Sequence, residues 1–168
     1  MTKKPTFTLR DARLEDFEEI YDIFCHVLNE GKTYSYTLEE MTPERSLAYW
    51  MSAPGTHCIV ADVKGKVAGV GSVRPNRTGR AHHVANASFM VHPSYRKQGI
   101  AKALGKKALS YAKKEGYKAM QFNFVVSANQ PAVELWMDLG FKVVGTLPKG
   151  FRHATKGKVD VYIMHRFL

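Results

Sequence analysis

Hydrophobic residues recur with helical spacing in two long segments of the chain. From residue 14 to 28, and again from 99 to 114, the apolar positions return every three or four residues, which is typical of a helix with one buried face. The first stripe comprises Leu14, Phe17, Ile20, Tyr21, Phe24, Val27 and Leu28, and the second Ile100, Leu104, Ala108 and Ala112. We expect Gly31 and Gly116 to end these two helices.

Strand patterns fill most of the remaining chain. Strands are predicted at residues 6–10, 57–63, 66–73, 84–91, 118–126, 141–146 and 159–167, short helices from Thr42-Pro43 and over 131–139, and loops at 32–41, 74–81 and 147–158. Lys64-Gly65 is typical of a hairpin turn and predicts antiparallel neighbours. The later strand–helix–strand units require a right-handed crossover between parallel strands. The order β-α-α-β-β-β-α-β-α-β-β therefore predicts an α/β fold with a mixed sheet flanked by helices.

Length and composition indicate one domain over residues 1–168. No run approaches the ~18 apolar residues of a membrane span, so no membrane partner is expected. Met1–Thr6 has lysines but no apolar stretch after it, which argues against a secretory signal. Cys25 and Cys58 fit no disulfide or metal pattern, which favours reduced core thiols and a cytoplasmic location. The histidines, including His82-His83, lack ligand spacing, so no metal is predicted.

The formal net charge of +10 favours an anionic partner or serves solubility alone. A nucleic acid, an anionic membrane and a phosphate-rich cofactor would each be attracted by this positive charge. The chain has no ladder of alternating aromatic and basic residues and no recognised nucleic-acid motif, so a basic nucleic-acid-binding module is the weaker reading.

The segment 91–101 predicts a phosphate site between a strand and a helix. The first N–H groups of a helix lack internal partners and carry partial positive charge, which suits an anion. Gly99 lets the backbone approach that anion, and Arg96 and Lys97 add charge. The spacing is neither GxxxxGK[ST] nor GxGxxG. An ordinary strand–helix turn with a glycine and surface lysines is the alternative.

Two motifs in order resemble the GNAT superfamily of N-acetyltransferases. Residues 96–101, Arg-Lys-Gln-Gly-Ile-Ala, resemble its R/Q-x-x-G-x-G/A motif, and Asn129, Ala132, Leu135-Trp136 and Gly140-Phe141 resemble its second signature. The resemblance covers nearly the full chain. It implies a mostly antiparallel sheet splayed between the fourth and fifth strands and an acetyl-CoA co-substrate in the gap.

The resemblance also implies the cofactor-binding residues. The main chain of Met90 and Val91 would pair with pantetheine, and the amides of Arg96, Lys97, Gln98, Gly99, Ile100 and Ala101 would bind the pyrophosphate. Asn129 would contact the pantetheine arm, cap the following helix, or do both. The family often has tyrosine, a proton donor to the CoA thiolate, where this chain has Trp136; we expect Trp136 to pack in the core.

Two asparagines on neighbouring strands are the predicted catalytic residues. Asn86 lies in the predicted strand 84–91 and Asn123 in 118–126, and a buried amide needs a partner. They either pair with each other or with backbone, or orient an acceptor amine. The surrounding residues resemble the yeast azetidine-2-carboxylate (proline-analogue) N-acetyltransferase branch, in which the paired asparagines serve catalysis and substrate binding and the enzyme is a dimer.

These observations predict transfer of an acetyl group to a small amine acceptor in a ternary complex. An α-amine with a pKa of roughly 8 needs less deprotonation than a lysine, which favours an amino or imino acid. A backbone N–H near Val91 would stabilise the oxyanion. A protein or peptide N-acetyltransferase and a non-catalytic acyl-CoA-binding protein remain the alternatives. A small-molecule acceptor, no nucleic acid and a homodimer are the expected partners.

Overall fold

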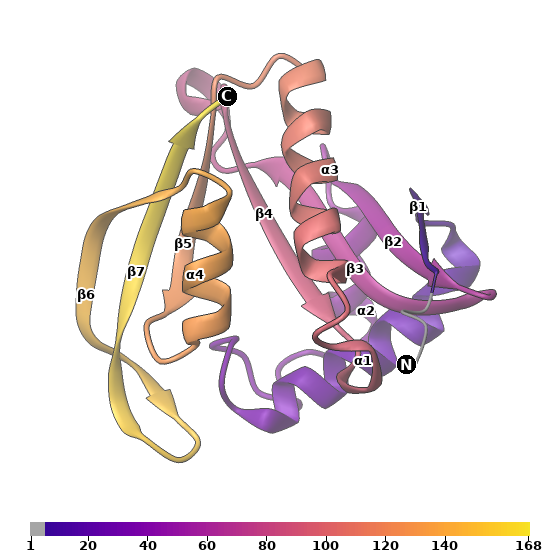
Figure 1. Ribbon diagram of the computed structural model, residues 1–168, viewed down its shortest axis with the longest axis horizontal. Coiled ribbons are helices and arrows are strands. Elements are labelled where there is room, and N and C mark those ends of the chain that lie inside the picture. The colour runs from indigo at the N-terminus through magenta and orange to yellow at the C-terminus, as the bar shows by residue number, and fades with distance from the viewer. Residues whose placement is uncertain (1–5) are drawn as a thin grey trace.

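Within residues 6–168, seven strands form one sheet, in the order β1-β2-β3-β4-β5-β7-β6. The computed structural model describes residues 6–168 (Figure 1). The strands are β1 (Thr8–Asp11), β2 (His57–Val63), β3 (Lys66–Pro75), β4 (Val84–Val91), β5 (Ala119–Val126), β6 (Lys142–His153) and β7 (Gly157–Phe167), and the helices are α1 (Phe17–Glu30), α2 (Pro43–Leu47), α3 (Ile100–Lys114) and α4 (Gln130–Asp138). The sequence of Met1–Thr6 argues against a secretory signal. Of this segment, only Thr6 lies within the described residues.

The predicted fold class and order of elements are confirmed. Neighbouring strands are antiparallel everywhere except between β4 and β5, which are parallel. The β2–β3 hairpin turns at Lys64 and Gly65, both in the left-handed region with φ of 52° and 81°. Such a pair of residues gives the turn whose twist matches that of the strands.

The sheet splits between β4 and β5. Only Val84 with Ala119 and Ala85 with Met120 are in register, at the start of both strands. Beyond this point β5 continues along β7 with a bulge between Phe122 and Val125, and the ribbons of β4 and β5 diverge (Figure 1). The splay implied by the family resemblance is therefore present.

Helices cover both faces of the sheet. On one face, α3 and α4 pack through Ala108, Ala112, Val133 and Trp136 against β4 and β5. On the other face, α1 packs its apolar stripe with Trp50 against β2 and β3. All four residues of the predicted α3 stripe are buried. The prediction that Leu14 belongs to the buried stripe of α1 is wrong. Leu14 is 70% exposed, because residues 14–16 form a separate 3₁₀ turn before the helix begins.

The ends of the helices follow the predicted signals. Gly31 ends α1 with φ of 62°, and Gly116 and Gly140 follow α3 and α4 with φ of 87° each. Thr42 caps α2, where its hydroxyl accepts a hydrogen bond from the Arg45 backbone N–H at 3.4 Å. The turns that position the site are thus encoded locally.

The predicted loop over residues 147–158 is wrong. Strand β6 continues to His153 and β7 begins at Gly157, so most of this segment is a long antiparallel hairpin. β6 is an edge strand and is exposed along most of its length. Its second half therefore lacks the alternation of apolar and polar residues by which a strand is recognised in a sequence. Pro148 is tolerated because an edge strand has one unpaired side.

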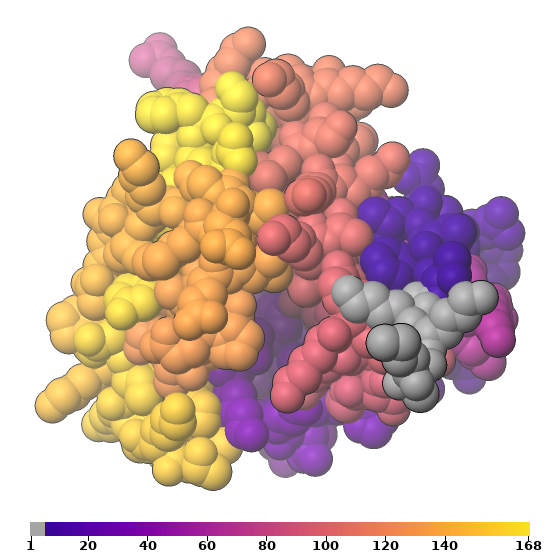
Figure 2. Space-filling view, viewed as in Figure 1, coloured from indigo at the N-terminus to yellow at the C-terminus, as the bar shows by residue number. Residues whose placement is uncertain are grey.

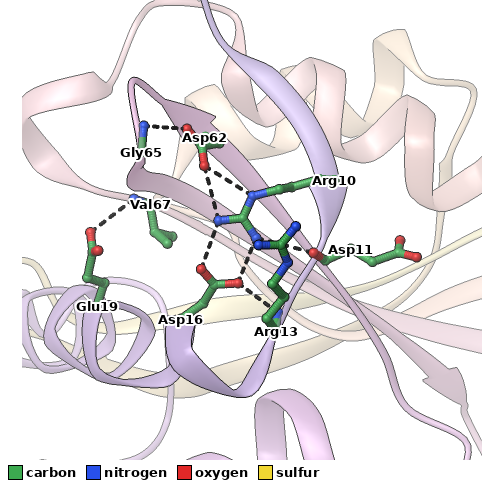
Figure 3. Close-up of polar contacts among 8 residues, drawn as sticks. All are labelled: Arg10, Asp11, Arg13, Asp16, Glu19, Asp62, Gly65 and Val67. Atoms are coloured by element: carbon green, nitrogen blue, oxygen red, sulfur yellow. Dashed lines mark hydrogen bonds and ion pairs between the residues drawn. The ribbon is translucent and has the colours of Figure 1, made fainter.

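A charged network fastens β1, α1 and the β2–β3 hairpin together (Figure 3). Arg10 donates to both carboxylate oxygens of Asp16 at 2.7 and 2.8 Å and to Asp62 at 3.1 Å. Asp16 also accepts the Arg13 backbone N–H at 2.7 Å, and Asp62 accepts that of Gly65 at 2.7 Å. The hydrogen bonds from Arg10 hold the pKa of Asp16 below its ordinary value. This network fixes the turn that leads into α1.

We expect Asp16→Asn to lower the free energy of unfolding at pH 7 by about 1.5–3 kcal/mol, as for hydrogen bonds to charged groups. A carboxyl whose pKa is lowered by folding stabilises the protein above its unfolded pKa and loses that effect as pH falls through the folded pKa. The difference from wild type should therefore shrink progressively below about pH 4. Urea denaturation across this range measures it. Asp22→Asn, on the exposed face of α1, is the control, and an equal effect of both variants would contradict the role of Asp16.

Candidate active site

The divergence of β4 and β5 opens a cleft of about 930 Å³. Both strands line it, together with the start of α3, the start of α4, the segment after α1 and the tip of the β6–β7 hairpin. Figure 2 shows the hollow between the orange residues of α4 and the salmon residues leading into α3. The cleft is therefore built from segments that lie far apart in the sequence.

Peptide groups of β4 face this cleft without a strand partner. Asn76 donates its N–H to the Val84 carbonyl and His92 donates to Ala68, so the even-numbered residues of β4 hydrogen-bond to β3. The alternation of a strand then directs the peptide groups of Phe89 and Val91 toward the gap. The Phe89 carbonyl accepts the Tyr34 hydroxyl at 2.7 Å. Met90, predicted to pair with pantetheine through its main chain, instead directs its peptide groups toward β3.

The loop before α3 has the geometry of an anion site. Lys97 and Gly99 both adopt left-handed conformations, with φ of 61° and 83°. Positive φ is uncommon for a residue with a side chain, and such turns create concave arrangements of N–H groups. Gly99 is the N-cap of α3, so the unpaired N–H groups of the helix follow directly. The predicted strand–loop–helix arrangement is confirmed.

Nearly all the residues predicted to hold the cofactor line the cleft. They are Met90, Val91, Arg96, Lys97, Gly99, Ile100, Ala101 and Asn129. Gln98 is not among the lining residues, and its side chain donates to the Ser94 carbonyl at 3.4 Å. Asn129 is the N-cap of α4, but its side chain makes no capping hydrogen bond. The capping role proposed for this side chain is therefore not observed.

The cleft is strongly basic. Its lining includes the cations Lys32, Arg74, Arg96, Lys97, Lys102 and Lys156. Among the described residues that line it, Glu30 is the one acid, and it accepts two hydrogen bonds from Arg96 at 2.8 and 2.9 Å. Part of the positive charge of the chain is thus concentrated where a polyanion could bind.

Asn86 and Asn123 both line the cleft but do not pair with each other. Asn123 donates to the Asn76 side chain at 2.7 Å and accepts from Gln121 at 2.9 Å. An amide has two N–H groups and two lone pairs, so Asn123 keeps one of each. Within residues 6–168, the half-buried Asn86 side chain has no hydrogen-bond partner. The two asparagines are brought to one cleft, with Asn123 oriented and Asn86 available.

One wall of the cleft is polar and was not predicted from the sequence; it is made by Tyr34, Tyr36, Tyr49, Ser88 and Arg74. The Tyr49 hydroxyl lies 2.8 Å from Ser88 Oγ, which also accepts from Arg74 at 3.2 Å. Burial raises the pKa of Tyr34 and of Tyr36, so both phenols stay neutral near pH 7. The tyrosines lie in a predicted loop and a short helix, where no sequence periodicity distinguishes them.

Trp136 packs in the core, as predicted. Its ring lies 4.9 Å from those of Phe89 and Phe122, measured between centroids, and only 8% of the residue is exposed. It also lines the cleft. An indole N–H is a donor that does not ionise near neutral pH, so this position provides no acid.

The tip of the β6–β7 hairpin closes one end of the cleft. The Ala154 N–H donates to the Gly31 carbonyl at 2.9 Å, joining the hairpin to the end of α1. His153, Thr155 and Lys156 line the cleft from this tip. The basic segment 147–158 therefore contributes a wall of the site.

Both cysteines are free thiols. Burial raises the pKa of Cys58 to about 12, so this thiol is protonated at neutral pH and is no nucleophile. Neither cysteine is among the described residues that line the cleft.

Between residues 6 and 168 there is no cluster of three or more His, Cys, Asp or Glu that could hold a metal ion. No helix in that range is long and apolar enough to cross a membrane.

The chain belongs to the acetyltransferase (GNAT) family, whose model matches residues 15–141. Members of this class are acetyl-CoA-dependent N-acetyltransferases, and the splayed sheet and the loop before α3 agree with that assignment.

Three relatives are similar over different parts of the chain. N-acetyltransferase aca1 of Schizosaccharomyces pombe is 34% identical over 112 residues, 66% of this chain and 54% of that protein. N-acetylaspartate synthetase of Xenopus tropicalis is 35% identical over 99 residues, 59% of this chain and 35% of that protein. An N-alpha-acetyltransferase of Sulfurisphaera tokodaii is 30% identical over 174 residues, 96% of this chain and 93% of that protein. The chain thus spans about half of aca1, whose yeast origin agrees with the predicted branch.

Two solved structures share the fold. A GCN5-related N-acetyltransferase from Kribbella flavida is 42% identical with a TM-score of 0.92, over 96% of this chain and 98% of that chain. The Salmonella typhimurium protein yncA, solved with its cofactor acetyl-CoA, is 22% identical with a TM-score of 0.86, over 97% of this chain and 94% of that chain.

We expect Gly99→Ala to weaken CoA binding, because the left-handed backbone that places the α3 amides is unfavourable for alanine by about 1–2 kcal/mol. Isothermal titration with CoA measures the affinity, and thermal denaturation measures the stability. Gly116→Ala is a matched control, since Gly116 has a φ of 87° at the other end of α3 and neither position has an atom within 4 Å of an added Cβ. Both variants should lose similar stability and only Gly99→Ala should lose affinity. Equal CoA affinity in both would contradict the prediction.

Proposed function

We propose that the protein transfers the acetyl group of acetyl-CoA to the amine of a small amino or imino acid by direct attack in a ternary complex. The observation that carries the proposal is the gap between β4 and β5, which is basic at the α3 end. Away from that end it is lined by the amides of Asn86 on β4 and Asn123 on β5 and by phenols from the segments that flank α2. One cleft thus has a place for a polyanionic donor and a place for a small polar acceptor.

The residues at the α3 end fit acetyl-CoA. The left-handed loop and the free N–H groups of α3 suit its pyrophosphate, with Arg96, Lys97 and Lys102 nearby. The gap-facing peptide groups of Phe89 and Val91 suit the amides of pantetheine, as an added strand would. The N–H at the end of β4 is the proposed donor to the oxyanion.

The chemical step needs little from ionisable side chains. The lone pair of a neutral amine attacks the acetyl carbon, an N–C bond forms, the C–S bond breaks and CoA leaves as thiolate. An ordinary thiol has a pKa of about 8.5, so the thiolate is a fair leaving group, and water can carry the proton lost by the amine. Asn86 and Asn123 are proposed to orient the amine. The buried thiol of Cys58 argues against an acyl-enzyme.

The relatives support an amino-acid acceptor without naming one for this chain. One similar protein is an N-acetylaspartate synthetase, whereas one of the relatives that align along almost the whole chain is an N-alpha-acetyltransferase. Acetylation of a peptide N-terminus is therefore the second candidate. The homodimer and the cytoplasmic location remain predictions from the sequence.

The test of the acceptor class is thiol release from acetyl-CoA with amino acids, imino acids, polyamines, aminoglycosides and peptides. We expect the highest kcat/KM with a free amino or imino acid. Turnover of peptide amines alone would select the second candidate. CoA binding without turnover of any amine would contradict the proposed function and favour a non-catalytic acyl-CoA-binding protein.

We expect Asn86→Ala and Asn123→Ala each to lower kcat/KM for the acceptor by about 10- to 100-fold, the equivalent of one or two lost hydrogen bonds. The affinity for CoA should not change. Asn29→Ala, exposed on α1, is the control. Full turnover by both cleft variants would show that the asparagines have no catalytic role.

A further inference from the structure

Arg74 is held rigidly in the wall of the acceptor half of the cleft. It lies near the end of β3, directly opposite Asn86 in the register with β4, so the two side chains emerge on the same face of the sheet. Its Nη2 donates to Ser88 Oγ at 3.2 Å, and its guanidinium carbon lies 4.6 Å from the centre of the Tyr49 ring. A hydrogen bond and a cation–π contact thus fix the group from two directions.

Among residues 6–168, the other terminal nitrogen of Arg74 has no partner. Nη1 is buried and makes no hydrogen bond. Arg74 also forms no ion pair with any carboxylate of the described residues. A buried donor without an acceptor is costly, and more so when it belongs to a cation. The structure therefore holds an arginine that lacks its anion.

The surroundings of Arg74 do not supply that anion. Glu30, the acid that lines the described part of the cleft, is engaged by Arg96. Tyr34 and Tyr36 cannot serve as phenolates near neutral pH, because burial raises the pKa of both. The missing partner must come with a ligand.

We infer that Arg74 binds the carboxylate of the acceptor, which restricts the substrate to amines that carry a carboxylate close to the amino group. This inference rests on the proposed function and deepens it. A guanidinium is planar and matches the two oxygens of a carboxylate, which a lysine does not. In an α-amino or α-imino acid the amine is two bonds from the carboxylate carbon. A carboxylate at Arg74 therefore places the amine beside Asn86 and β4.

Entry of the carboxylate requires a small adjustment of the polar wall. Nη1 is sealed from solvent, so a neighbouring side chain must shift before an oxygen can reach it. Tyr36 lines the cleft from the segment between α1 and α2, residues 31–42, which contains no helix or strand. Changes of side-chain rotamer of this kind commonly accompany binding.

The test compares acids with their amides in Arg74→Gln. L-Proline with L-prolinamide, and L-alanine with L-alaninamide, differ in the carboxylate. Because amidation also lowers the pKa of the amine, each substrate is compared between the variant and the wild type. We expect the variant to lose about 10- to 100-fold in kcat/KM for the two acids, mainly through KM, and to keep its activity on the amides. Arg74→Lys keeps the charge without the planar guanidinium. Its kcat/KM for the acids should lie between those of Arg74→Gln and the wild type.

Two controls separate this role from a structural one. Arg80→Gln removes one positive charge from an exposed position outside the cleft and should change neither activity. Thermal denaturation and CoA titration of the Arg74 variants show whether the fold and the donor site persist. Equal losses for acids and amides, or an unchanged KM for the acids, would overturn the assignment of Arg74 while leaving the proposed function in place. Failure of the wild type to acetylate any amino or imino acid of the panel used above, with CoA still bound, would overturn both.

Discussion

The site depends on two strands that stop pairing after their second residue. Beyond Ala85 and Met120, β4 and β5 no longer share hydrogen bonds, and the odd-numbered peptide groups of β4 face a gap. Unpaired backbone at a strand edge seeks a partner. The rings of Phe89, Phe122 and Trp136 pack together on the face of the sheet that α3 and α4 cover. The separation is therefore part of the packed core, and the cleft exists before any ligand enters.

The two substrates need different surroundings, and this one cleft provides both. At the α3 end, backbone N–H groups and lysines create positive potential, which a phosphate-rich molecule needs. Along β4 and β5, amides, phenols and one fixed guanidinium provide hydrogen bonds without a carboxylate base. This division suits a reaction in which a polyanionic donor binds at one end of the cleft and a small amino or imino acid attacks from the other through its neutral amine.

Much of the fold could be predicted because its signals are local. Residues 84–91 and 57–63 have strand patterns that the structure reproduces to the residue, and Gly31 and Gly116 end their helices as expected. The loop before α3 was identifiable because a glycine and basic residues follow a strand. Only the first part of β6 was identifiable, as the predicted strand 141–146; its continuation to His153 was not, because an exposed edge strand with Pro148 and two glycines carries no alternation. Arg74 and the three tyrosines come together only through tertiary contacts. A single arginine after an apolar strand gives no sign in the sequence that one of its nitrogens will be buried without a partner.

The position of β7 bears on how the protein is made. β7 follows β6 in the sequence, yet it lies between β5 and β6 in the sheet. Until residues 157–167 leave the ribosome, β5 has an open edge along most of its length, and Ala154 has no ordered hairpin from which to reach Gly31. A nascent chain can therefore complete the N-terminal half of the sheet early and must keep the second half unpaired for longer. During synthesis that exposed edge is the segment most prone to pairing with another chain.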